Sequence, residues 1–344
     1  MMWVDIGIAL VVILVAAELF TNGVEWVGDR FGLSEGAIGS VLAAVGTALP
    51  ETVLPLIAVL VGHSAGREIG VGAILGAPVM LTTLAMAVLG LSVLGFSRFG
   101  RRAPRIRADA AVPTLDLAFF LALFSLAIVA GLVHARVFHV VIAAVLVGAY
   151  AVYVRLHFRA PVETLHREAA QAIRPLYLGR AALRRPAAGA DPPAAPAWAS
   201  IAQTLVGLAV IVAGARVFVV LVTDISDRSH VPYVLFALLV APIATELPEI
   251  FNASVIWARR GRDTLAVGNV TGALVFQAVF PVTIGLTLTP WRLRGDALVA
   301  ALVALGAGAV LYATVRLRGE FGPRLLLAQG ALYAAFVAFL LARI

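Results

Sequence analysis

Ten stretches of the chain are almost wholly apolar, and the polar residues gather in the segments between them. Each stretch has about 17–25 residues, which is the length that an α-helix needs to cross a bilayer. The ten-residue alternating segments of a membrane barrel are absent, so we expect helical spans whose backbone groups bond internally. The spans are predicted near residues 6–27, 37–61, 70–95, 111–133, 137–157, 201–223, 232–257, 265–288, 297–315 and 324–342.

The composition agrees with an all-α integral membrane protein. Of the 344 residues, 62% are hydrophobic and 13% charged, whereas soluble domains carry about 25% charged residues. The absence of cysteine excludes disulfides and thiolate metal sites. The first stretch lacks a basic leader segment and runs on into further apolar sequence, so we interpret it as the first span and not as a signal peptide.

The net charge of +7 comes from arginines in the short connections, where basic residues determine topology and do not indicate nucleic acid binding. If the N-terminus lies outside, the inner connections hold 19 arginines and the outer ones 6. The positive-inside rule therefore predicts a multi-pass protein of the inner (cytoplasmic) membrane with both termini outside.

One long connection divides the chain. We expect a first five-helix repeat over 1–158, a cytoplasmic linker loop over 159–199 and a second five-helix repeat over 200–344. The mixed charges at the start of the linker suggest a short interfacial helix, and the proline- and alanine-rich part that follows suggests a flexible tether.

Glu51 is the single charged residue between Ala37 and Gly62. A charge at that depth costs at least about 2.5–3.5 kcal/mol, which makes it a functional-site hypothesis by default. Pro50 precedes it and lacks the N–H that would bond the carbonyl of Gly46. A helix broken at this point, with a freed carbonyl beside a carboxylate, is typical of cation sites in transporters.

The same pattern returns 198 residues later. The segment from Thr47 to Glu51 (TALPE) aligns without a gap on the segment from Thr245 to Glu249 (TELPE), and an offset of 196 then aligns two glycine pairs. Because each half holds an odd number of spans, the halves insert in opposite orientations. This is the inverted-repeat architecture of secondary transporters, and it predicts that the two glutamates meet at the membrane midplane.

Each threonine lies four residues before its glutamate, so each pair shares one helix face. Glu246 adds a carboxylate to the second face, where the first repeat has Ala48. Carboxylates, hydroxyls and freed carbonyls form an all-oxygen shell, which suits Ca²⁺ or Na⁺ better than soft transition metals. Three carboxylates held close together cannot all stay ionised, so protons are a further candidate ion.

Each of these residues also has a purely structural interpretation. The paired glutamates could be structural carboxylates capped by hydroxyls, and Glu246 could pair with an arginine or face a water-filled vestibule. We expect Gly72, Gly76 and their second-half equivalents to allow close helix packing, and we expect the Gln277 amide to be a simple inter-helix contact. Glu18 and Arg216, at equivalent positions, either form a buried pair or contact water independently.

These motifs resemble the sodium/calcium exchanger superfamily, the cation/calcium antiporters. Its two repeats read roughly GTSLPE and then GNxxGSN. Here the first half reads GTALPE and GAILGAP, and the second reads ATELPE and GNVTGAL. The resemblance implies a ten-helix antiporter with alternating access, in which Glu51 and Glu249 are the central ion ligands. The other site residues that it implies are Glu246, Thr47, Thr245, Gly46, Ala244 and Asn269.

The chain departs from the family pattern at the serine–asparagine pair, which is replaced by Ala77-Pro78 and by Ala273-Leu274. The resemblance thus implies an antiporter that exchanges Ca²⁺ or another cation against Na⁺ or H⁺, and the lost polar residues favour protons. The alternative is a degenerate membrane protein that binds a cation without transporting it. We expect inorganic cations and the lipid bilayer as partners, no nucleic acid, no cofactor and no enzymatic activity. The oligomeric state is open, and a monomer is compatible with the sequence.

Overall fold

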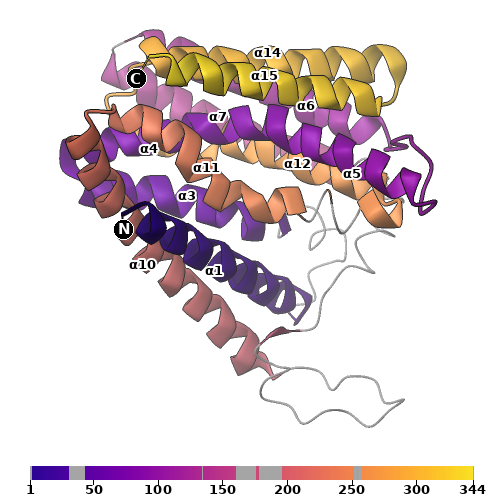
Figure 1. The fold of residues 1–344 in the computed structure, drawn as a ribbon, viewed down its shortest axis with the longest axis horizontal. Coiled ribbons are helices and arrows are strands. Elements are labelled where there is room, and N and C mark those ends of the chain that lie inside the picture. Colours follow the sequence, from indigo (N-terminus) through magenta and orange to yellow (C-terminus); the bar gives the residue numbers. More distant parts are fainter. Residues whose placement is uncertain are drawn as a thin grey trace.

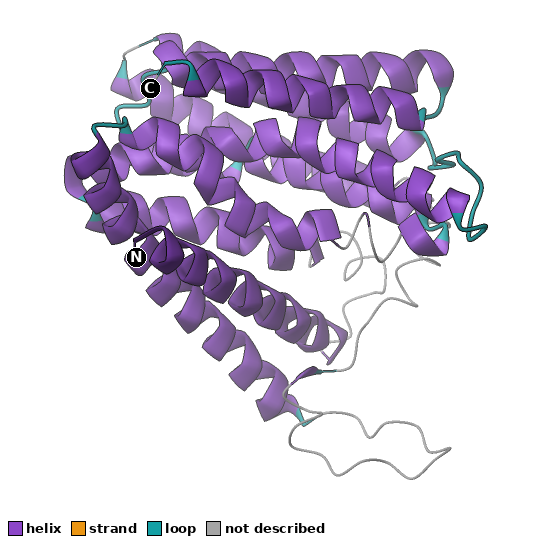
Figure 2. Cartoon of the chain, viewed as in Figure 1, coloured by secondary structure: helices purple, strands orange, loops and turns teal. Residues whose placement is uncertain are grey.

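The structure is a computed structural model that describes residues 2–30, 43–133, 135–159, 176–177, 196–251, 254 and 258–343. These residues are almost entirely helical (Figures 1 and 2). The helices are α1 (Met2–Arg30), α3 (Ala43–Val61), α4 (His63–Met80), α5 (Met86–Arg98), α6 (Ala111–Leu132), α7 (Arg136–Arg159), α10 (Ala197–Ser229), α11 (Tyr233–Phe251), α12 (Asp263–Gln277), α13 (Phe280–Leu288), α14 (Gly295–Arg318) and α15 (Pro323–Leu341), with a π-helix, η2 (Leu81–Ala85), and a 3₁₀-helix, η4 (Ala258–Arg260).

Eight helical segments of the described chain are long and apolar enough to cross a membrane, and shorter apolar helices cover Glu51–Val61 and Tyr233–Leu247. The prediction of an all-α integral membrane protein is therefore confirmed, and each of the ten predicted spans coincides with a helix or a broken helix. The count of ten membrane crossings and the inverted repeat stay predictions.

Two of the spans are interrupted near their middle. The third consists of α4, the π-helix η2 and α5, and the eighth consists of α12 and α13, separated at Ala278 and Val279. Pro78 has no amide hydrogen to donate, and the hydroxyl of Thr82 donates to its carbonyl at 2.7 Å. π-bulges of this kind are rare and frequently occur at functional sites.

The helices α1 and α10 pack along each other on the opposite side of the molecule from α14 and α15 (Figure 1). Glycines of α10 allow the close approach. A Cβ at Gly207 would lie 2.9 Å from the backbone of Phe20, and one at Gly214 would lie 2.7 Å from the side chain of Ile13. Small residues at such contacts let two membrane helices interdigitate.

The helices α4 and α11 pack through the first glycine pair. A Cβ at Gly72 would lie 2.5 Å from the carbonyl oxygen of Val234, and one at Gly76 would lie 2.4 Å from that of Leu238. The expectation of close packing at Gly72 and Gly76 is confirmed. This contact holds the span that carries η2 against the helix that carries Glu246.

At the second-half equivalents the approach is looser. A Cβ at Gly268 would lie 3.2 Å from Val112, and one at Gly272 would lie 3.8 Å from the Tyr153 hydroxyl, so close packing is not found at Gly272.

A buried ion pair connects the α5–α6 loop to the start of α12. Arg102 contacts Asp263 at 2.8 Å, and the two side chains are 7% and 5% exposed. The backbone N–H of Arg107 also donates to Asp263, at 2.7 Å. Arg102 and Asp263 therefore neutralise each other at the buried start of α12.

Most of the predicted linker, 160–175 and 178–195, lies outside the described residues, so its interfacial helix and tether remain untested. Tyr177 lies within the described part. Its hydroxyl donates to Glu18 at 2.8 Å and its backbone N–H donates to Asn22 at 3.1 Å. Arg216 is exposed on α10.

Candidate functional site

Three helices bring polar side chains together in the interior. Glu51 lies on α3, Glu246 on α11, and Gln277 is the last residue of α12. All three are buried, with exposed fractions of 4%, 0% and 0%. The surrounding turns are apolar, so the helices pack together through their aliphatic side chains and carry these polar groups inside.

Gln277 joins the two carboxyl groups. Its Nε2 donates to Glu51 Oε2 at 2.8 Å and to Glu246 Oε1 at 2.7 Å. A side-chain amide carries two hydrogens on this nitrogen, so both bonds form at once. Because the carboxyl groups of Glu51 and Glu246 both accept from this one nitrogen, they lie close together, and a proton held by the pair would relieve their repulsion.

Oxygen acceptors dominate the remainder of the cluster. Glu246 Oε2 and Gln277 Oε1 are buried without a hydrogen-bond partner in the part of the chain that the structure describes. The hydroxyl of Thr245 is 3.4 Å from Glu246 Oε1. Buried acceptors without donors are costly, and a hard cation, which prefers oxygen ligands, would satisfy them.

The break in the eighth span positions Gln277. The helix α12 ends at this residue, and α13 begins at Phe280 with Pro281 in its first turn. The predicted offset of 196 aligns Gln277 with Leu81, the first residue of the π-helix η2. If the predicted alignment holds, the third helix of each half is irregular at the same position, which is Leu81 in the first half and the polar Gln277 in the second.

The structure brings three of the predicted site residues together, which are Glu51, Glu246 and Thr245. Four other predicted site residues lie outside the part of the structure whose side chains are described: Gly46, Thr47, Ala244 and Glu249. Asn269 is half-buried on α12, eight residues before Gln277 and thus about 12 Å away along the helix axis.

One expectation needs correction. The helices α3 and α11 run on through Pro50 and Pro248, so the predicted break at the prolines is wrong, although each proline still lacks an amide donor. The interruptions lie one span later in each half. Gln277 makes the expected inter-helix contact, and its two partners are the buried carboxyl groups of the cluster. A single amide in an apolar span gives no local signal of those partners.

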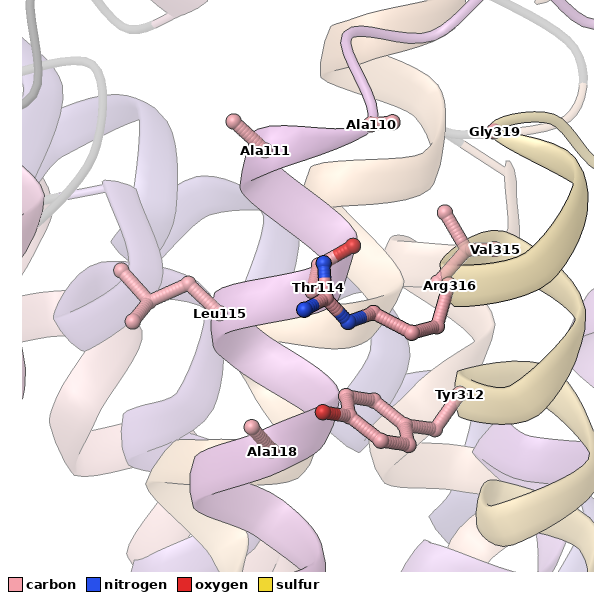
Figure 3. Close-up of a pocket in the computed structure, with 9 residues that line it drawn as sticks. All are labelled: Ala110, Ala111, Thr114, Leu115, Ala118, Tyr312, Val315, Arg316 and Gly319. Atoms are coloured by element: carbon pink, nitrogen blue, oxygen red, sulfur yellow. The ribbon is translucent and has the colours of Figure 1, made fainter.

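Two other kinds of feature would be alternative ion sites among the described residues, namely acidic or histidine clusters and surface grooves. No group of three or more His, Asp or Glu side chains that could hold a metal ion occurs among them. A groove of about 570 Å³ lies between α6 and α14 and is lined by Thr114, Tyr312, Arg316 and small residues (Figure 3). None of the lining residues belongs to the Glu51 cluster.

Buried carboxyl groups and an amide between membrane-spanning helices, beside interrupted helices, are typical of cation sites in membrane transporters. The sequence model of the sodium/calcium exchanger protein family matches residues 2–159 and 199–342. The chain belongs to this family, which confirms the resemblance drawn from its motifs.

Individual relatives agree with this assignment. The chain is 30% identical over 99 residues to the putative antiporter CaxA of Alkalimonas amylolytica; the matched stretch covers 29% of this chain and 31% of that relative. Its fold is similar to the crystal structure of the H⁺/Ca²⁺ exchanger CAX, with a TM-score of 0.73 at 13% identity, covering 99% of this chain and 87% of the other. It is also similar to the sodium-calcium exchanger NCX_Mj, with a TM-score of 0.59 at 20% identity, covering 98% and 99%.

Proposed function

We propose that this protein is a secondary active antiporter of the cytoplasmic membrane, which exchanges Ca²⁺ or another cation against H⁺ or Na⁺ by alternating access. Glu51, Glu246, Glu249 and Gln277 bind the ions, assisted by Thr47 and Thr245. The two inverted repeats, 1–158 and 200–344, supply the two halves of the site. No covalent chemistry takes place, so the protein is not an enzyme.

One observation carries the proposal: the Gln277 amide bridges two buried carboxyl groups from opposite halves of an exchanger-family chain. A hard cation that enters this cluster takes the carboxylate oxygens as ligands. Its charge replaces the proton that two neighbouring carboxyl groups would otherwise share. Competition between cation and proton for the same oxygens is the mechanism that couples their opposite movements.

Two features of the site favour H⁺ over Na⁺ as the counter-ion. The family's serine–asparagine pair is replaced by Ala77-Pro78 and Ala273-Leu274, which offer no side-chain oxygens for Na⁺. Two carboxyl groups that accept from one amide nitrogen lie close enough to share a proton. Na⁺ remains the alternative counter-ion, with the backbone carbonyls near Pro50 and Pro248 as its ligands.

The experiment is a flux measurement in proteoliposomes that contain the full chain. A Ca²⁺-sensitive dye inside reports uptake while a pH gradient and a Na⁺ gradient are imposed separately. We expect the pH gradient to drive Ca²⁺ movement, and Glu51→Gln to abolish it. Glu320→Gln, which alters an exposed carboxylate, is the matched control. Full flux in Glu51→Gln would contradict the proposal.

A second candidate is a protein that binds a cation without exchanging it, and the loss of the serine–asparagine pair in both halves favours it. Calorimetry separates the two functions. Ca²⁺ binding that Glu51→Gln abolishes, together with no gradient-driven flux for any tested cation, would support the non-transporting protein.

A further inference from the structure

A second buried carboxyl group lies outside the Glu51 cluster. Asp116, on α6, is 0% exposed. The Tyr153 hydroxyl of α7 donates to its Oδ1 at 2.9 Å, and the Thr271 hydroxyl of α12 donates to its Oδ2 at 2.6 Å. Three helices therefore contribute to one polar cluster, and an ionisable residue inside a membrane protein is expensive unless it has a use.

No permanently charged cation faces Asp116 in the described part of the chain. On α7 the facing groups are the phenols Tyr150 and Tyr153 and the imidazole of His157, whose Nδ1 is 4.0 Å from Asp116 Oδ1. On α12 the facing group is the Thr271 hydroxyl.

The helix α14 also packs on α6, and its ionisable groups face elsewhere. Tyr312 and Arg316 line the groove on the face of α6 that carries Thr114 and Ala118 (Figure 3). Asp116 is not among the groove residues, since it lies on the opposite face of the helix. A carboxylate buried without a charged partner is costly, and a bound proton removes that cost.

The hydrogen bonds suit both states of the carboxyl group. Thr271 Oγ1 is 2.6 Å from Asp116 Oδ2 and 3.1 Å from the carbonyl oxygen of Val267. A hydroxyl has one proton to donate. When Asp116 is ionised, Thr271 donates to it; when Asp116 is protonated, Asp116 donates to Thr271, and Thr271 donates to Val267. The proton enters or leaves without repacking of the helices.

The distances favour a proton over a metal ion. Oxygens that bind a hard cation lie about 2.3–2.6 Å from it, which keeps them farther apart than hydrogen-bonded oxygens. The Asp116 oxygens are 2.6 and 2.9 Å from the two hydroxyls, which are hydrogen-bond distances. The spacing of the cluster therefore suits a shared proton better than a metal ion.

His157 connects the cluster with the predicted cytoplasmic side. Its side chain is 15% exposed, and it lies one turn beyond Tyr153 on the same face of α7. Asp116 is five residues, or about 8 Å of helix axis, from the start of α6. Towards the Glu51 cluster, aromatic rings follow instead, from Tyr153 to Tyr150 at 5.6 Å and on to Phe276 at 6.1 Å.

We propose that Asp116, held by Tyr153 and Thr271, is a second proton-binding site, which exchanges protons with the cytoplasmic side through His157. In the transfer, an N–H bond of the protonated imidazole breaks, an O–H bond forms on the carboxylate, and the imidazole is left neutral. The site binds its proton whether or not the Glu51 cluster exchanges cations, so the two proposals fail independently.

Infrared difference spectroscopy of the full chain tests this site without any ion gradient. The measurement is made in Ca²⁺-free detergent, in a Glu51→Gln/Glu246→Gln/Glu249→Gln background that removes the carboxyl groups of the proposed ion-binding cluster. We expect a protonated-carboxyl band that titrates with pH and disappears in Asp116→Asn. Glu320→Gln is the control and should leave the band unchanged. A titrating band that survives Asp116→Asn would overturn the proposal.

Two further measurements test the site without relying on Asp116→Asn, and they distinguish a proton from a bound metal cation. Tyr153→Phe removes a donor to the ionised form, so the band should titrate at a pH about one unit higher, and an unchanged midpoint counts against the site. Addition of Na⁺ at constant pH should leave the band in place. Its loss on adding Na⁺ would reassign the cluster to a metal cation.

Discussion

Gln277 Nε2 donates a hydrogen bond to Glu51 Oε2 at 2.8 Å, across a separation of 226 residues. The two residues come from opposite halves of the chain and meet in its interior. The contact explains why an apolar span tolerates a carboxylate, because the amide satisfies one of its oxygens and leaves the cluster open to an ion.

Glu51→Gln should abolish gradient-driven Ca²⁺ flux and weaken Ca²⁺ binding about 10- to 100-fold. The substitution keeps the shape of the side chain and removes its charge, and interactions with a charged group contribute about 1.5–3 kcal/mol. Flux in proteoliposomes and calorimetric binding measure the two effects. Binding that stays within twofold of the wild type would show that Glu51 is not an ion ligand.

Gln277→Leu should destabilise the protein by about 1–3 kcal/mol, because Glu51 Oε2 and Glu246 Oε1 each lose a buried donor. Bound Ca²⁺ should restore much of this loss, since the cation satisfies the same oxygens. Thermal unfolding with and without Ca²⁺ measures both effects.

The matched control for this substitution is Gln329→Leu. Gln329 is also a buried amide, and its Nε2 donates a long hydrogen bond of 3.5 Å to the carbonyl of Ala307. This variant should lose less stability and show no extra rescue by Ca²⁺. Equal rescue in the two variants would argue against a special role for Gln277.

Glu246→Ser should flatten the pH dependence of Ca²⁺ transport. Glu246 and Glu51 accept hydrogen bonds from the same nitrogen, so their carboxyl groups lie close enough to share one proton. Without the second carboxyl group this shared proton is lost. Serine also restores the residue of the family motif, so Na⁺-driven flux should rise. The test measures initial Ca²⁺ flux over a pH series, with the pH gradient and the Na⁺ gradient imposed in turn. A pH–rate profile of unchanged shape in Glu246→Ser would contradict this role.

Arg102→Ala should cost about 3–5 kcal/mol of stability, because it leaves Asp263 charged and buried. Arg228→Ala is the matched control. Its pair with Asp224 is largely exposed, at 69% and 42%, and exposed pairs contribute about 0–1 kcal/mol. Comparison of the two melting temperatures tests the interior position of the α5–α6 loop, and equal shifts would contradict it.

Gly76→Ala should separate α4 from α11 and lower both stability and flux. Its Cβ would lie 2.4 Å from the carbonyl oxygen of Leu238, which belongs to a rigid helix backbone. Gly95→Ala has no atom within 4 Å of the new Cβ and should be neutral or stabilising by up to about 1 kcal/mol. Similar melting temperatures for the two variants would mean that the close contact at Gly76 is unimportant.

The sequence by itself determined the class of protein and the apolar segments that form its helices, because lipid imposes a length on each apolar helix that can be counted along the chain. It also identified Glu51 and Glu246, since a charge in an apolar run is visible without a structure. Close packing at Gly72 and Gly76 followed from the same reasoning, because small residues at i and i+4 share one helix face.

The tertiary structure alone decided which polar groups meet. A lone amide at Gln277 or a lone carboxylate at Asp116 has no distinctive local pattern, and its role depends on partners 226 and 155 residues away. The location of the helix breaks was equally hidden. Proline removes a hydrogen bond wherever it occurs, but the packing of neighbouring helices decides whether the helix continues, as it does through Pro50, or opens, as it does after Gln277.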